Sequence, residues 1–269
     1  MAAIYAAVLS IMLYYNILTI RQLDREIYGM STYVQKIVSA PTKENVDFER
    51  LQRANILIIN GGAAGSGTVI SMEDGYIYIL TARHVAESDK DTDVLEIEVP
   101  MIDHNYKDTN KRHMNRVGSK YVVVDKTKDV VMCDDYDMAL VRIKDFVGHE
   151  LSFIPPGVKN PELGDTLYVV GNPQCFRDVI SKGIYVGADD FDGTMEDRVY
   201  AGVVCGNSGG AVINTDGEIV GVIYAKLAGS VVSHIGIFVP RKPMIFFVDG
   251  AFKLFEKETT VTESNKILN

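Results

Sequence analysis

The stretch Cys205-Gly206-Asn207-Ser208-Gly209-Gly210-Ala211-Val212 places one serine among three glycines, directly before an apolar run. Glycines on both sides let the backbone turn sharply and leave the serine hydroxyl exposed. They also let consecutive N–H groups point at one place, as an oxyanion hole requires. A glycine-rich turn between two strands is the alternative interpretation of the same residues. The stretch therefore predicts a nucleophile only if the rest of the chain supplies a base and an acid.

A histidine and an aspartate upstream are candidates for those roles. His84 follows the apolar run Tyr76–Leu80, where an imidazole is well placed to act as a general base. Asp137 opens the apolar run Met138–Ile143, a position that can half bury its carboxylate and aim it. Taken alone, a histidine in this position is more often a hydrogen-bonded structural residue. The order His84, Asp137, Ser208 is nevertheless that of chymotrypsin-like proteases, and it differs from the subtilisin and α/β-hydrolase orders.

Short apolar runs rich in β-branched residues fill most of the chain after residue 50, and glycine turns separate them. Few helical patterns interrupt them, so the pattern predicts an all-β fold, either an antiparallel sandwich or a pair of barrels. The expected strands are Asn55–Ile59, Thr68–Ile70, Tyr76–Leu80, Val94–Val99, Tyr121–Val124, Met138–Ile143, Thr166–Val170, Ile180–Val186, Val199–Val204, Ala211–Ile213, Ile219–Ala225 and Ile235–Val239. A short C-terminal helix is expected from Pro243 to about Glu256, with a polar tail over residues 257–269.

Several segments resemble trypsin-like serine peptidases, and within that family the HtrA/Deg type. The segments are Gly65-Ser66-Gly67-Thr68-Val69-Ile70, Leu80-Thr81-Ala82-Arg83-His84-Val85, Asp137-Met138-Ala139-Leu140, Gly206-Asn207-Ser208-Gly209-Gly210, and the closing stretches Asn214–Gly221 and His234–Pro240. The resemblance covers about residues 51–240 and implies a chymotrypsin-like fold of two antiparallel six-stranded barrels. Two residues depart from the family pattern, because Cys205 stands where proline is usual and Tyr200 where an aspartate is common.

The resemblance also implies a role for each matching residue. Ser208 would be the nucleophile, His84 the base and Asp137 the orienting carboxylate, while the N–H groups of Gly206 and Ser208 would form the oxyanion hole. The substrate-binding residues that it implies are Gly202, Val203, Ile223, Tyr224 and Ala225. The segment Ala201-Gly202-Val203-Val204 is apolar and carries no acid, so we expect an aliphatic or other uncharged side chain before the scissile bond, and not lysine or arginine.

The expected function is therefore a serine endopeptidase that acts on protein or peptide substrates without a metal or cofactor. Two alternatives remain open: a catalytically silent module that binds peptides on a protease fold, and a viral-type processing protease. Only about thirty residues follow Pro240, so no PDZ domain of the HtrA kind is expected. The expected domains are an anchor over 1–20, a linker helix and connector over 21–48, a protease domain over 49–256 and the tail over 257–269.

The composition argues against several other classes of function. The chain has 269 residues, of which 47% are hydrophobic, enough for a sizeable core. Its formal net charge of −9 argues against nucleic acid as a partner. Cys133, Cys175 and Cys205 make an odd number without CxxC spacing, which excludes a disulfide framework and a cysteine zinc site.

The N-terminus predicts a membrane anchor. Ala2–Ile20 contains no charged residue and is mostly apolar, which is close to the length of a membrane-spanning helix. A cleavable signal peptide and a buried helix are the alternatives. The resemblance favours an extracytoplasmic protease domain, whereas Arg21 and Arg25, which follow the span, favour a cytoplasmic one.

A heptad-like pattern follows the anchor and predicts self-association. Its apolar positions alternate spacings of three and four and are Ile20, Leu23, Ile27, Met30, Val34 and Ile37. A helix docked on its own barrel is the alternative. By resemblance to HtrA proteins, the seam indicates a homotrimer.

Overall fold

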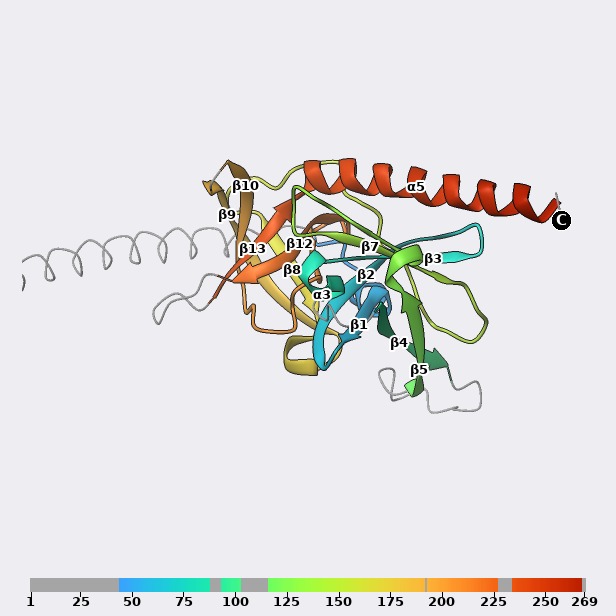
Figure 1. Cartoon of the computed structure of the whole chain (residues 1–269). Coiled ribbons are helices and arrows are strands. Elements are labelled where there is room, and N and C mark those ends of the chain that lie inside the picture. Colours follow the sequence, from blue (N-terminus) through green and yellow to red (C-terminus); the bar gives the residue numbers. More distant parts are fainter. Residues whose placement is uncertain (1–43, 88–92, 103–115, 192, 227–233, 268–269) are drawn as a thin grey trace, which may run out of the picture. The chain divides into compact units, whose positions relative to one another are not determined.

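Each of the expected apolar runs overlaps a strand of the computed structural model, which describes residues 44–87, 93–102, 116–191, 193–226 and 234–267. The strands are β1 Asn55–Asn60, β2 Ala63–Glu73, β3 Tyr76–Thr81, β4 Val94–Ile102, β5 Arg116–Asp125, β6 Val130–Met132, β7 Ala139–Lys144, β8 Thr166–Gly171, β9 Val179–Phe191, β10 Thr194–Tyr200, β11 Ala211–Ile213, β12 Ile219–Lys226 and β13 Ile235–Pro240. The helices are α2 Phe48–Ala54, α3 Arg83–Glu87, α4 Lys126–Asp129, the 3-10 turn η1 Pro173–Cys175 and α5 Arg241–Ile267 (Figure 1).

The second group of strands forms the closed barrel that was expected. Its strands pair in the order β10-β13-β12-β11-β8-β9. Alternate side chains point inward and form a buried cluster of their own, which includes Val169, Val199, Val212 and Phe238. Because side chains alternate between the two faces of a strand, the same strands supply apolar residues to a second cluster outside the barrel.

The first group of strands does not close, so the expectation of a six-stranded first barrel is wrong. These strands make one open sheet of seven strands in the order β5-β4-β1-β2-β3-β7-β6. Between β5 and β6, Asp125 accepts a hydrogen bond from the N–H of Thr127 at 3.0 Å and caps α4. The single turn of α4 leads into a β6 of only three residues, which pairs with β7 and not with β5.

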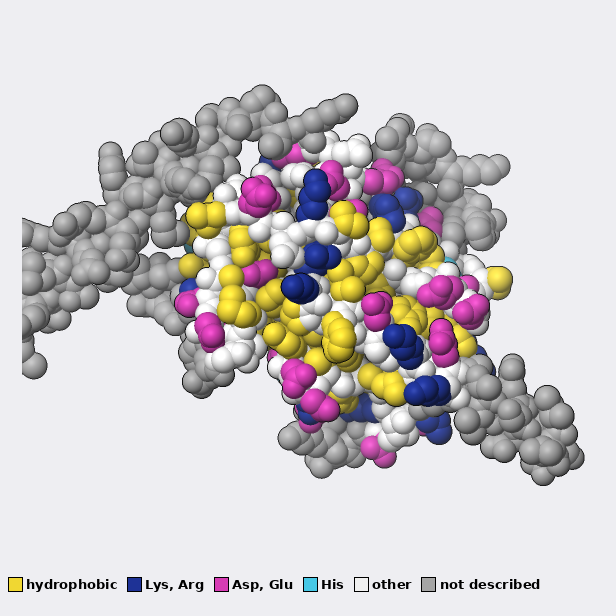
Figure 2. All heavy atoms as spheres, turned by 90° about the horizontal axis from the view of Figure 1, so that it is seen from above, with side chains coloured by type: hydrophobic (Ala, Val, Ile, Leu, Met, Phe, Trp, Pro, Cys, Tyr) yellow, Lys and Arg dark blue, Asp and Glu magenta, His cyan; other side chains and the backbone are white. Residues whose placement is uncertain are grey.

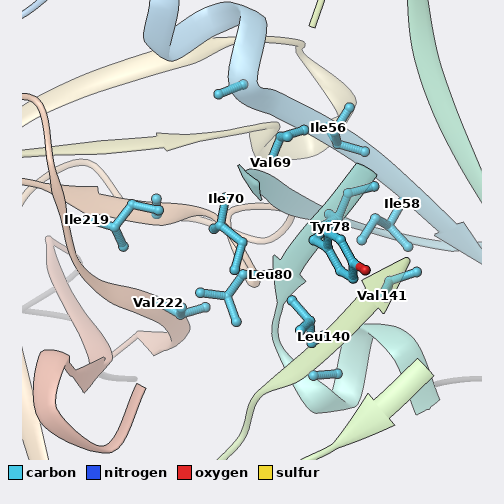
Figure 3. Close-up of a cluster of buried hydrophobic side chains, with 14 of the residues drawn as sticks. Ile56, Ile58, Val69, Ile70, Tyr78, Leu80, Leu140, Val141, Ile219 and Val222 are labelled. Carbon is cyan, nitrogen blue, oxygen red and sulfur yellow. The ribbon is translucent and has the colours of Figure 1, made fainter. Parts of the chain in front are cut away.

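The largest apolar cluster joins the open sheet to the barrel. Ile56, Ile58, Leu80 and Leu140 come from the open sheet, and Val222 comes from β12 of the barrel. Figure 3 shows Leu80 next to Val222, with Ile56 and Ile58 farther into the open sheet. All five are at most 2% exposed, so burial of this cluster stabilises the arrangement of both groups together.

The C-terminal helix packs against strands of both groups, with its backbone close to β12 and β13 and its aromatic side chains on β3 and β7. It begins at Arg241, two residues before the expected start, and continues to Ile267, beyond the expected end near Glu256. Figure 1 shows α5 lying across the strands. The ring of Phe252 lies 4.6 Å from that of Tyr78, and the guanidinium of Arg142 lies 4.3 Å above the ring of Phe255. On the face of the molecule seen in Figure 2, apolar and charged side chains are mixed.

The expected membrane anchor, the heptad-like seam and most of the linker helix lie outside the described residues. Within the described ranges, no helix combines the length and the apolar character needed to span a bilayer. The described residues belong to one unit that begins at Glu44.

Candidate active site

The loop that precedes β11 has two positions that require glycine. Gly206 has φ +97° and Gly209 has φ +85°, values that residues with a side chain rarely adopt. A Cβ atom at Gly206 would lie 2.8 Å from the backbone nitrogen of Gln174, and one at Gly209 would overlap the carbonyl oxygen of Ser66. The glycines therefore allow a tight loop that packs against two distant segments and holds the half-buried Ser208 between them.

The hydrogen bonds of this loop leave two N–H groups unused. Three other N–H groups are bonded to carbonyl oxygens: Asn207 to Val204 at 3.1 Å, Gly209 to Ile223 at 2.7 Å and Gly210 to Asn207 at 2.9 Å. Within the described ranges, the N–H groups of Gly206 and Ser208 have no hydrogen-bond acceptor. Neighbouring backbone N–H groups without protein acceptors can bind an anion.

The orientation of the Gly206 N–H group follows from its neighbour. The carbonyl oxygen of Cys205 accepts a hydrogen bond from the backbone nitrogen of Gln174 at 2.8 Å. In a trans peptide the C=O and N–H groups point in opposite directions. The Gly206 N–H group therefore points away from Gln174. Gln174 and Cys175 themselves have positive φ angles of 51° and 64°.

His84 and Asp137 are in direct contact. Nδ1 of His84 lies 2.7 Å from Oδ2 of Asp137, and the backbone N–H of His84 donates to Oδ1 at 2.9 Å. The strands explain this contact, because Thr81 near the end of β3 pairs with Ala139 at the start of β7. An ionised carboxylate only accepts hydrogen bonds, so Nδ1 carries the hydrogen and Nε2 keeps its lone pair.

One cleft brings His84 and Ser208 together. It has a volume of about 250 Å³ and is lined by Ala63, Ala64, His84, Val85, Cys205, Gly206 and Ser208. The hydroxyl of Ser208 donates to the carbonyl oxygen of Tyr224 at 3.4 Å, and among the described residues no hydrogen bond joins it to His84. Such contacts are often long in sites without substrate. The cleft thus combines a hydroxyl, an imidazole held by a carboxylate, and unpaired N–H groups.

A family model described as "Trypsin-like peptidase domain" matches residues 65–222, more than half of the chain. The chain belongs to the trypsin-like peptidase family. This family membership confirms the resemblance carried by the sequence segments around His84, Asp137 and Ser208.

Similar proteins place this trypsin-like peptidase near the HtrA type. Two curated relatives are both named "Serine protease HtrA-like". The protein of Staphylococcus haemolyticus (strain JCSC1435) is 27% identical over 229 residues, 78% of this chain. That of Staphylococcus aureus (strain USA300) is 30% identical over 195 residues, 65% of this chain. The matched region spans 31% and 22% of these relatives, so the chain covers a third or less of their length.

Solved structures share the fold. The serine endoprotease from Yersinia pestis is 23% identical, with a TM-score of 0.57, and the match covers 81% of this chain and 68% of that one. A structure described as HtrA-type protease AlgW with tripeptide is 20% identical, also with a TM-score of 0.57, over 75% of this chain and 60% of that chain.

None of the expected substrate-binding residues lines the cleft of the trypsin-like peptidase. Val203 and Ile223 are at most 2% exposed and belong to the core of the closed barrel. Gly202 is exposed, and Ala225 is half-buried in β12. The stretch Ala201–Val204 follows β10 as a turn, because the strand ends at Tyr200 and the N–H of Val203 donates to the carbonyl of Ala201.

Tyr224 connects the cleft to a second pocket. Its carbonyl faces Ser208, while its hydroxyl donates to a carboxylate oxygen of Glu196. Burial and this hydrogen bond raise the pKa of the Tyr224 phenol. The second pocket, of about 260 Å³, is lined by Asp135, Tyr136, Asp137, Thr194, Met195, Glu196, Tyr224 and Val239. Within the described part of the chain, no group of three or more His, Cys, Asp or Glu side chains is arranged to hold a metal ion.

Two residues of the site had no assigned role from the sequence. Ser66 lies in a segment that carried the resemblance, and Asn172 was not singled out. The Ser66 hydroxyl donates to the carbonyl of Gly206 at 2.6 Å and accepts from the N–H of Asn172 at 2.7 Å. The sequence shows only that Ser66 lies between two glycines. That pattern does not reveal a contact with a loop 140 residues away.

Proposed function

We propose that the chain is a serine endopeptidase in which Ser208 is the nucleophile, His84 the general base and Asp137 the carboxylate that orients the imidazole. The observation that carries this proposal is that His84, bound through Nδ1 to Asp137 at 2.7 Å, shares one cleft with Ser208. Family membership supports the same activity. The protease fold alone, without these three side chains, would be equally compatible with a module that only binds peptides.

The proposed reaction has two halves, acylation and deacylation, and His84 acts first as a base and then as an acid in each. Oγ of Ser208 attacks the peptide carbonyl carbon as its proton moves to Nε2 of His84. The carbonyl oxygen becomes an oxyanion, which the unpaired N–H groups of Gly206 and Ser208 stabilise. The C–N bond then breaks and the proton on Nε2 passes to the leaving amine. In the second half, Nε2 of His84 deprotonates a water molecule, which attacks the acyl carbonyl carbon. The bond between that carbon and Oγ of Ser208 breaks, the proton on Nε2 returns to Oγ, and the carboxylic acid product leaves.

The test is labelling by a fluorophosphonate probe, which reacts with activated serine hydroxyls, together with turnover of peptides from a library. Ser208→Ala should abolish labelling, and His84→Ala should slow labelling and turnover by about 10³-fold or more. The double variant should be little worse than either single variant, because the three residues act as a unit. Independent, multiplicative losses would count against the mechanism, and unchanged turnover in Ser208→Ala would eliminate it.

We further propose that the residue before the scissile bond is aliphatic or otherwise uncharged. By the resemblance, the pocket for that side chain is walled by the segments near Tyr200–Val204 and Ile223–Lys226. Neither segment contains an acidic residue that could pair with a lysine or arginine. The cleavage profile of a peptide library tests this directly. Cleavage mainly after arginine or lysine would overturn it.

A further inference from the structure

Ser66 is the residue through which the open sheet holds the loop of the proposed nucleophile. It lies in β2, is completely buried, and contacts that loop at two places. Its backbone N–H donates to the carbonyl oxygen of Ser208 at 2.7 Å. Its hydroxyl donates to the carbonyl oxygen of Gly206 at 2.6 Å. One residue thus binds the carbonyls on both sides of Asn207.

These bonds fix the peptide planes next to the two unpaired N–H groups. The plane between Gly206 and Asn207 is bound on one side by Ser66 Oγ and on the other through the N–H of Asn207, which donates to Val204. A peptide plane bound at both ends cannot rotate without breaking one bond. The neighbouring N–H groups of Gly206 and Ser208 are then held in their present directions.

The Ser66 hydroxyl is itself oriented by a second bond. The N–H of Asn172 donates to Oγ of Ser66 at 2.7 Å and occupies one lone pair of that oxygen. The single hydrogen of the hydroxyl is directed to the carbonyl oxygen of Gly206. The side chain of Asn172 is anchored in turn, through Nδ2 to the carbonyl of Ile56 at 2.8 Å. Thr81, three residues before His84, donates from Oγ1 to the carbonyl of Ser66 at 2.6 Å.

We propose that Ser66 is a positioning residue for the proposed reaction: its hydroxyl holds the Gly206 carbonyl so that the N–H groups of Gly206 and Ser208 remain aimed at the developing oxyanion. This inference rests on the proposed function. Ser66 touches no reacting atom. Its effect is on the barrier to the chemical step and not on binding of the substrate, because the oxyanion forms only during the reaction.

The experiment measures fluorophosphonate labelling of the full chain as a function of probe concentration. This separates the maximal rate, kinact, from the half-saturating concentration, KI. In Ser66→Ala, kinact should fall about tenfold with KI unchanged. The expected loss is smaller than the roughly 10²–10³-fold caused by deleting an oxyanion donor, because the donors remain present but less well held.

Thr68→Val is the matched control. Thr68 lies two residues along the same strand and is 2% exposed, and its hydroxyl has no hydrogen-bond partner within the described part of the chain. This substitution removes a buried hydroxyl at nearly constant volume and should leave kinact within about twofold. Ser66→Cys, which keeps a weak donor of similar size, should give an intermediate kinact and serves if Ser66→Ala does not fold.

The outcomes separate this inference from the proposed function. Unchanged kinact in folded Ser66→Ala or Ser66→Cys overturns the role of Ser66, as does an equal loss in Thr68→Val or a loss expressed only in KI. If Ser208→Ala is still labelled at the wild-type rate, the proposed function itself fails, whatever Ser66 does.

Discussion

At the scale of single residues, the shape of the loop at Ser208 depends on Gly206. Its φ of +97° and its close approach to the backbone of Asn172 and Gln174 exclude a side chain for two independent reasons. The backbone must move if a Cβ atom is added, and the carbonyl held by Ser66 moves with it. The proposed oxyanion hole is therefore sensitive to one methyl group.

We predict that Gly206→Ala lowers the rate of fluorophosphonate labelling by about 100-fold or more, because the N–H groups lose their alignment. Gly217→Ala is the control, since Gly217 has a similar φ of +79° but open space around it. That variant should lose about 1 kcal/mol of unfolding free energy and keep its labelling rate. Equal labelling of the two variants would contradict the prediction.

Asp197 gives a prediction about pH. It is 8% exposed and accepts a hydrogen bond from the hydroxyl of Tyr185 at 2.8 Å. Burial raises the pKa of this carboxyl, and the hydrogen bond offsets part of the effect. Because the folded state binds this proton more tightly than the unfolded state, the group lowers stability as pH rises from the ordinary aspartate pKa through the raised one.

We therefore expect Asp197→Asn to be more stable than the wild type at pH 7, by on the order of 1 kcal/mol. The advantage should be smaller at pH 4 than at pH 7, because the wild-type carboxyl takes up its proton as the pH falls through the raised pKa. Urea unfolding at both pH values measures it. Asp216→Asn, which removes an exposed carboxylate, controls for the change in net charge. A constant advantage at both pH values would refute the argument.

Residue-level prediction from the sequence succeeded where a short motif determines a contact and stopped where distant segments determine it. His84 and Asp137 were paired on motif and order, and the structure places their side chains 2.7 Å apart. Ser66 and Asn172 gained no role, because their bonds join positions 106 and 140 residues apart. The sequence gives no account of which segments meet at that range.

At the scale of elements, the strands follow from alternating apolar residues, but closure of a sheet does not. β6 was missed because its three residues are all half-buried and show no alternation. In the open first sheet, the single turn of α4 lies between β5 and β6, and Asp125 caps this turn locally. Periodicity reports which face of a strand is buried, and it does not report which strand lies beside which.

Helix α5 is attached mainly through one face, and this gives a prediction at the same scale. Phe255 is 2% exposed and lies under the guanidinium of Arg142, whereas Phe246 on the same helix is 84% exposed. Phe255→Ala should cost about 3–5 kcal/mol of unfolding free energy. Phe246→Ala should cost less than about 0.5 kcal/mol. Thermal or urea unfolding of both variants measures the difference, and similar costs would show that α5 is docked differently.

At the scale of the whole described unit, one apolar cluster contains side chains from the open sheet, from the closed barrel and from α5. Opening either strand group would expose that cluster. We predict that peptides from β1–β3 and from β11–β13 report the same opening free energy in native-state hydrogen exchange at moderate urea concentrations. Earlier exchange of one group alone would show that the two groups unfold independently.

The edge of the first sheet at β5 also bears on how the protein self-associates in concentrated solution. Among the described strands β5 pairs with β4 alone, and its residues Tyr121 and Val123 are 51% and 62% exposed. An unpaired strand edge can template pairing with another molecule. Lys120, on that edge, supplies one charge that opposes such pairing. The net charge of −9 makes neighbouring molecules repel each other. We therefore expect added salt, which screens this repulsion, to increase self-association in concentrated solutions.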